Sequence, residues 1–65
     1  MNYVITFGLG TPMKKYAMVF RNKTEDGVRE LASTYFRGSW AGIYTEDYYK
    51  NAEWSSELTL LESSL

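Results

Sequence analysis

The hydrophobic pattern of the chain changes its period once, and this change sets the order of its structural elements. In residues 2–8 and 15–22 apolar side chains alternate with their neighbours, which is typical of strands. Residues 24–38 have a helical period, and a strand pattern returns in residues 39–45. The apolar stripe of the helix consists of Val28, Leu31, Ala32, Tyr35 and Phe36. The sequence therefore predicts an α+β fold of order β-β-α-β.

The expected elements form a small antiparallel sheet of three to four strands packed against one helix, in a single domain spanning residues 1–65. Thr24 is the expected N-cap of the helix and Gly38 its C-terminal stop. In the third strand, alternation predicts Trp40 and Tyr44 on one face and Ala41 and Ile43 on the other.

The C-terminal part of the chain allows two interpretations. Thr45 is a candidate cap for a short helical turn that follows it. Further on, Leu58 and Leu60 alternate as in a strand, whereas Leu58, Leu61 and Leu65 repeat as in a helix. A short fourth strand near 57–61 is favoured, because it would cover an open edge of the sheet.

The glycine-rich stretch TFGLGTPMKKY, residues 6–16, is either a phosphate-binding loop or the bend of a hairpin. A phosphate loop needs a helix after its glycines, and here a strand pattern follows. Pro12 also lacks the N–H group that an anion would accept. The hairpin is therefore predicted, with Gly8 and Gly10 free to adopt positive φ at the bend. Contact between the Gly8–Pro12 loop and a partner stays open.

The composition argues against an enzyme. The chain has no Cys and no His, so thiolate chemistry, imidazole catalysis and the common zinc ligands are missing. No serine has an imidazole to activate it, and no cofactor or metal site is expected. Neither a signal peptide nor a membrane span is expected, and the lack of cysteine favours a cytoplasmic protein.

Aromatic and acidic residues are concentrated in the last third of the chain. The net charge is −1 overall, but residues 44–65 hold five acids and one lysine. Trp and Tyr anchor protein interfaces, and nearby acids steer a basic partner. The predicted partner-binding residues are Tyr44, Glu46, Asp47, Tyr48, Tyr49 and Trp54. Replacing Glu46, Asp47, Tyr48 or Trp54 is expected to leave the fold intact, because none is needed for the periodic patterns.

Two alternatives to a protein-binding module follow from the same residues. A small nucleic-acid-binding accessory protein would use the aromatic and basic side chains of YAMVFR. The acids outnumber the bases by eight to seven, which argues against direct nucleic-acid binding. A homo-oligomeric structural module would instead bury the surplus aromatic residues between copies.

Four segments, FGLGTP, KYAMVF, VREL and WAGIYTEDYY, resemble those of small uncharacterised bacteriophage proteins. That group has an FGxG turn and a W-A-x-x-Y-[ST]-E segment, and the resemblance covers about residues 2–49. It implies a phage-encoded protein in the cytoplasm of an infected bacterial cell. The resemblance transfers no activity, but small phage proteins without catalytic residues often act by binding a host protein. We therefore expect a small binding protein that inhibits or redirects a host protein, with an anti-defence inhibitor of the anti-CRISPR type as one form. The expected partner is a host protein, with a nucleic-acid-binding defence complex as the leading class.

Overall fold

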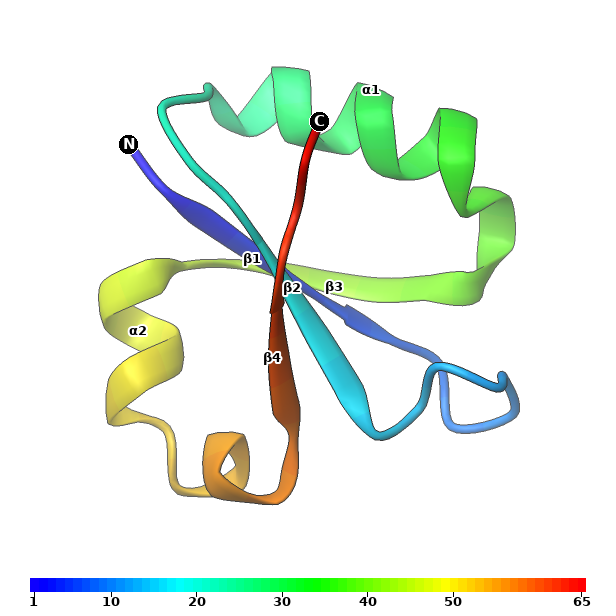
Figure 1. Cartoon of the computed structure of the whole chain (residues 1–65), viewed down its shortest axis with the longest axis vertical. Helices are drawn as coiled ribbons and strands as arrows, with labels where there is room; N and C mark the ends of the chain where they lie inside the picture. The colour runs from blue at the N-terminus through cyan, green and yellow to red at the C-terminus, as the bar shows by residue number, and fades with distance from the viewer.

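Four strands form one mixed sheet in the order β3-β1-β2-β4. The computed structural model describes all 65 residues. The strands are β1 (Tyr3–Phe7), β2 (Tyr16–Phe20), β3 (Trp40–Thr45) and β4 (Thr59–Glu62). β1 is antiparallel to both β2 and β3, whereas β4 is parallel to β2. Strands β3 and β4 are therefore the two edges of the sheet (Figure 1).

Each α-helix begins at a threonine cap. Helix α1 (Glu25–Tyr35) begins after Thr24, whose hydroxyl accepts a hydrogen bond from the N–H of Gly27, and acids fill its first turn. Helix α2 (Glu46–Asn51) begins after Thr45, whose hydroxyl accepts from the N–H of Tyr48. Two short 3-10 helices, η1 (Arg37–Ser39) and η2 (Glu53–Glu57), follow α1 and α2.

The first face of the sheet carries the larger core. Ile5, Phe7 and Phe20 from the strands pack with Val28 and Ala32 of α1, and all five are buried. The ring of Phe36 meets that of Phe7 edge-on, with centroids 5.1 Å apart. Four residues of the helical stripe predicted from sequence, Val28, Leu31, Ala32 and Phe36, belong to this core, whereas the fifth, Tyr35, is 59% exposed. Helix α1 lies over this face of the sheet (Figure 1).

The second face has its own smaller core, which lies beneath α2 and η2. Val4, Ala17 and Val19 from the strands pack with Tyr49 of α2, and Leu58 adds partly buried contacts. Aliphatic side chains therefore project from both faces of the central strands β1 and β2, which explains why Val4 and Ile5 are both fully buried.

The α+β class and the element order are confirmed, and the C-terminal segment is a strand. The sheet is mixed rather than antiparallel, and a second helix packs on it. The chain leaves β3, crosses the second face through α2 and η2, and starts β4 beside Lys15, next to the beginning of β2. This helical crossover returns the chain to the end where β3 began, so β4 runs parallel to β2.

A β-bulge overturns the predicted faces of β3. Gly42 pairs with Thr6, but Trp40 pairs with Phe7, so the register shifts by one residue at Ala41. Trp40 therefore packs on the first face together with Ile43, while Tyr44 pairs with Val4 and lies on the second face. Simple alternation placed Trp40 and Tyr44 on the same face, which is wrong.

The backbone conformations at two turns differ from those predicted. The hairpin of β1 and β2 is confirmed, yet neither Gly8 nor Gly10 has positive φ. The loop between the two strands is instead anchored by the N–H of Gly8, which donates to the Ser39 carbonyl at 2.8 Å. At the end of α1 the left-handed residue is Arg37, with φ 51°, and not Gly38.

Candidate protein-binding site

The predicted aromatic residues gather over the second face at the β3 side of the sheet. Tyr44 comes from β3, Tyr48 and Tyr49 from α2, and Trp54 from η2. The Tyr44 and Tyr48 rings are stacked, with centroids 5.5 Å apart and planes inclined by 7°. The centroid of the Trp54 ring lies 5.2 Å from that of Tyr44 and 5.8 Å from that of Tyr49. We call the row Tyr48–Tyr44–Trp54 the aromatic row.

Local sequence explains how the row is held. Gly42 precedes Tyr44 on the same face, and a Cβ atom at Gly42 would lie only 2.8 Å from the Tyr44 hydroxyl. The Tyr44 ring therefore folds back along its own strand and covers the glycine, as aromatic residues do at edge glycines. Thr45 then caps α2 and fixes the first helical turn, from which Tyr48 stacks on Tyr44.

The four aromatic side chains differ in exposure. Tyr48 is 59% exposed and Trp54 is 37% exposed, while Tyr44 is partly buried between them. Tyr49 is only 5% exposed and belongs to the second core, so the prediction that it contacts a partner is wrong. Burial also raises the pKa of the Tyr49 hydroxyl above its ordinary value.

Glu46 has a structural role that the sequence did not reveal. Its carboxylate accepts a hydrogen bond from the Asn2 side-chain amide at 3.0 Å and pairs with Arg21 at 3.3 Å. Lys50, one helical turn on, approaches to 3.9 Å. The Asn2 hydrogen bond, with help from the two cations, holds the pKa of Glu46 below its ordinary value. Glu46 thus ties α2 to the ends of β1 and β2, through contacts that the periodic patterns behind its expected dispensability do not contain.

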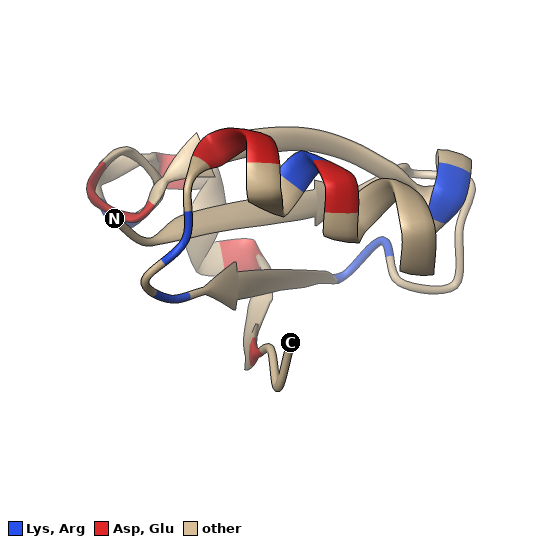
Figure 2. Ribbon diagram, turned by 90° about the horizontal axis from the view of Figure 1, so that it is seen from above, with Lys and Arg blue, Asp and Glu red and all other residues tan.

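Asp47 faces solvent beside Glu46. It is exposed, and its carboxylate makes no hydrogen bond and no ion pair within the chain. Figure 2 shows acidic segments at the first turn of α1 and around α2, and a basic segment after the last turn of α1. The predicted acidic surroundings of the aromatic residues are therefore supplied by Asp47 rather than by the internally paired Glu46.

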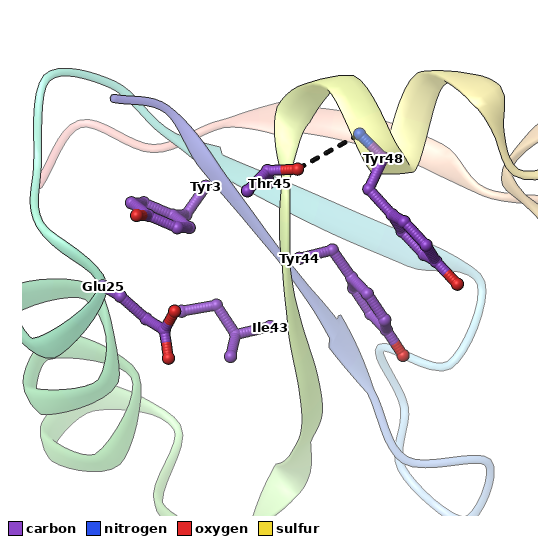
Figure 3. A pocket seen from close by; sticks show the side chains of 6 residues that line it. All are labelled: Tyr3, Glu25, Ile43, Tyr44, Thr45 and Tyr48. Carbon is purple, nitrogen blue, oxygen red and sulfur yellow. Dashed lines mark hydrogen bonds between the residues drawn. The ribbon is translucent and has the colours of Figure 1, made fainter.

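Two hollows open on either side of Tyr44. The first has a volume of about 270 Å³ and straddles β3, with Tyr3, Glu25 and Ile43 on one side of the strand and Tyr44 and Tyr48 on the other (Figure 3). We call it the edge hollow. The second, of about 230 Å³, lies between the loop after β1 and η2. This loop hollow is lined by Thr6, Phe7, Leu9, Lys14, Tyr44, Trp54, Glu57 and Leu58.

Sequence reasoning left open whether the Gly8–Pro12 loop, which contains Leu9, contacts a partner, and it missed Tyr3 as part of this surface. Leu9 is 86% exposed at the tip of the glycine-rich loop and lines the loop hollow. A large apolar residue between two glycines in a turn has no strand or helix face to bury it, so the exposure of Leu9 could have been predicted from the sequence. Tyr3 follows the alternation of β1 onto the first face, so only the folded structure reveals that it lines the edge hollow.

The arrangement is a surface of aromatic side chains with acidic residues at its margin. No three Asp or Glu side chains gather as metal ligands would, and none of the helices is long and apolar enough to cross a membrane. Comparison of the chain with protein-family models, with curated proteins and with solved structures finds no match. The site therefore rests on its own geometry: an aromatic row between two shallow hollows, with acids at its margin.

Proposed function

We propose that this chain is a small phage-encoded protein-binding module that inhibits or redirects a host protein through the aromatic row. The observation that carries the proposal is the contiguity of three rings from three separate elements. Exposed apolar residues are common singly, whereas a contiguous exposed patch on a soluble protein marks an interaction site. The phage resemblance of residues 2–49 supports a host target, with an anti-defence inhibitor of the anti-CRISPR type as the specific form.

The chemistry of the row favours a partner with a basic rim. Tyr48 and Trp54 would enter apolar pockets of the partner, where aromatic side chains contribute most of the binding energy. Asp47 and Glu53 lie near them on α2 and η2 and would speed the encounter with a positively charged surface. Nucleic-acid-processing complexes of host defence present such surfaces, which makes them the proposed target class.

Site-specific photo-cross-linking tests the proposal, with a control that the chain itself supplies. Tyr35 on α1 has the same exposed fraction as Tyr48, 59%, but belongs to a helix that packs on the opposite face. A photoreactive phenylalanine analogue placed at Tyr48 in bacterial cells should cross-link one discrete host protein, and the same analogue at Tyr35 should not. Equal cross-linking at both positions, or none at Tyr48, would contradict the proposal.

Binding kinetics with the cross-linked protein then distinguish the anchoring role of the aromatic residues from the steering role of the acids. Tyr48→Ala should weaken binding by about 1–4 kcal/mol, mainly through faster dissociation. Asp47→Lys should slow association, and the effect should shrink as salt is raised. Tyr35→Ala is the matched control and should change neither rate.

A further inference from the structure

The outer edge of β3 is open for pairing. Two backbone hydrogen bonds bracket the β1–β3 ladder: Glu46 N–H donates to the Asn2 carbonyl at 3.1 Å, and Gly8 N–H donates to the Ser39 carbonyl at 2.8 Å. Because backbone groups alternate in direction along an antiparallel pair, Tyr44 faces β1 and the next residues on either side face outward. The N–H and C=O groups of Ile43 and the N–H of Thr45 therefore point away from the sheet.

The two edges of the sheet are not equivalent. β3 is the longer edge, with the sequence WAGIYT, and it carries no charged residue. β4 has only four residues and ends in Glu62, which is held by Arg21 at 2.8 Å. Short length and charge protect edge strands from pairing with other chains. β4 has both of these features, whereas β3 has neither. The bulge of β3 lies at Ala41, and residues 42–45 beyond it keep regular pairing with β1, so this part of β3 is the edge available to a partner strand.

We propose that the partner of this edge is a second copy of the same chain, paired antiparallel through β3 about a two-fold axis at Ile43. In this register Ile43 of each copy exchanges two backbone hydrogen bonds with the partner's Ile43. The Thr45 N–H of each copy donates to the partner's Ala41 carbonyl. That carbonyl points outward, because the N–H of the same peptide, on Gly42, points to β1. The carbonyl of Thr45 is not needed, since it accepts the first hydrogen bond of α2 as the N-cap.

Charges of opposite sign at the two ends of β3 favour a second copy of the chain as the partner of this edge. Arg37 lies just before β3 and Asp47 just after it, and both are exposed. Neither side chain has an ion-pair partner within its own chain. Antiparallel pairing brings the Arg37 end of one copy to the Asp47 end of the other, and does so twice by symmetry. Parallel pairing would instead set like charges side by side.

Side chains near the axis fit this register. Ile43 is partly exposed on the first face and would pack against the partner's Ile43. On the second face Gly42, which is covered by the Tyr44 ring of its own chain, would lie opposite the partner's Tyr44, so the two Tyr44 rings would meet across the axis. A two-fold axis perpendicular to the sheet keeps both second faces on the same side. The dimer is therefore a continuous eight-stranded sheet that joins two aromatic rows into one surface.

Sedimentation of the purified chain from about 10 µM to about 1 mM tests the proposal, because mass action favours the dimer as concentration rises. The weight-average mass should climb from 7.5 kDa towards twice that value. A chain of 65 residues is accessible to chemical synthesis, so single amides can be N-methylated. N-methylation at Ile43 removes an outward donor that β1 does not use and should abolish dimerisation. N-methylation at Leu60, an outward amide on β4, is the matched control and should leave it unchanged.

Charge exchange provides a second test that leaves the backbone intact. Arg37→Glu and Asp47→Arg should each weaken the dimer by about tenfold, since each introduces two repulsive contacts. The double variant restores both attractive contacts and should dimerise within about threefold of the original. A mass of 7.5 kDa at every concentration would overturn the proposal. Equal effects of N-methylation at Ile43 and at Leu60 on dimerisation would also overturn it, as would a double variant that dimerises no better than the single variants. The assay contains no host protein, so its outcome is independent of cross-linking at Tyr48.

Discussion

Replacing Arg37 by glycine should stabilise the protein. Arg37 follows Phe36, the C-cap of α1, and has φ 51°, a left-handed conformation that helix ends commonly give to glycine. An L-residue there costs roughly 1–2 kcal/mol, because its Cβ crowds the following carbonyl. The Arg37 side chain is exposed and makes no hydrogen bond or ion pair in the monomer, so no stabilising contact is lost.

The size of the gain follows from two opposing terms. Glycine removes the Cβ strain, but it also makes the unfolded chain more flexible, which costs about 0.5–1 kcal/mol. The net increase in the free energy of unfolding should be about 0.5–1 kcal/mol. In a domain of this size 1 kcal/mol shifts the melting temperature by roughly 4–8 °C, so the expected rise is about 2–8 °C.

Urea and thermal unfolding followed by circular dichroism measure this change, at about 5 µM so that the monomer dominates. Arg37→Ala is the essential control, because it removes the guanidinium but keeps the Cβ atom. Asn22, with φ 56°, is the second left-handed residue, and Asn22→Gly should gain less because asparagine tolerates this conformation. A glycine variant no more stable than the alanine variant would refute the argument from backbone strain.

Three further predictions follow from the packing. Because the pKa of Glu46 is lowered in the folded state, this carboxylate stabilises the fold at neutral pH, and the stabilisation is lost as the pH falls below about 4.5 and through the lowered pKa. Glu46→Gln should therefore be less stable than the original chain at pH 7 and should lose less stability on acidification. Melting temperatures measured against pH test this expectation. Trp54→Ala should lower the free energy of unfolding in urea by about 2 kcal/mol, and Tyr48→Ala should lower it by less than about 1 kcal/mol, because Tyr48 is more exposed. The reverse order would place Tyr48 in the core. Phe20→Ala, at a fully buried site of the first core, should cost about 3–5 kcal/mol and leave the chain largely unfolded by circular dichroism; a cooperative transition like that of the original would contradict this core assignment.

The sequence was sufficient for several features that local interactions decide, although the backbone conformations at Gly8, Gly10 and Gly38 were not among them. Thr24 and Thr45 cap helices through contacts three residues away, and both caps were predicted. The helical stripe and the first hairpin also depend on neighbours in the chain. By contrast, the bulge at Ala41 appears only when β3 is aligned with β1, and one shifted residue exchanges the two faces.

In the candidate site, too, local features could be predicted from the sequence, whereas features that depend on the tertiary fold could not. Clustering of aromatic residues in sequence correctly indicated that Tyr44, Tyr48 and Trp54 meet in space. Which of the aromatic side chains is buried depended on the β3-α2-β4 crossover, which presses Tyr49 onto Val4 and Val19. No local pattern contains that information.

Arg37 links the stability argument to the proposed dimer. A residue in a strained backbone conformation persists when another interaction requires it, and such residues cluster at functional positions. Glycine occurs one position later, at Gly38, yet arginine occupies the left-handed position itself. Within the monomer the guanidinium has no partner that would offset this cost, whereas across the β3 edge it meets the unpaired carboxylate of the partner's Asp47. Arg37→Gly should therefore change stability and association in opposite directions, making the monomer harder to unfold and the dimer easier to dissociate. A variant that improved both would leave the strain at Arg37 without a functional explanation.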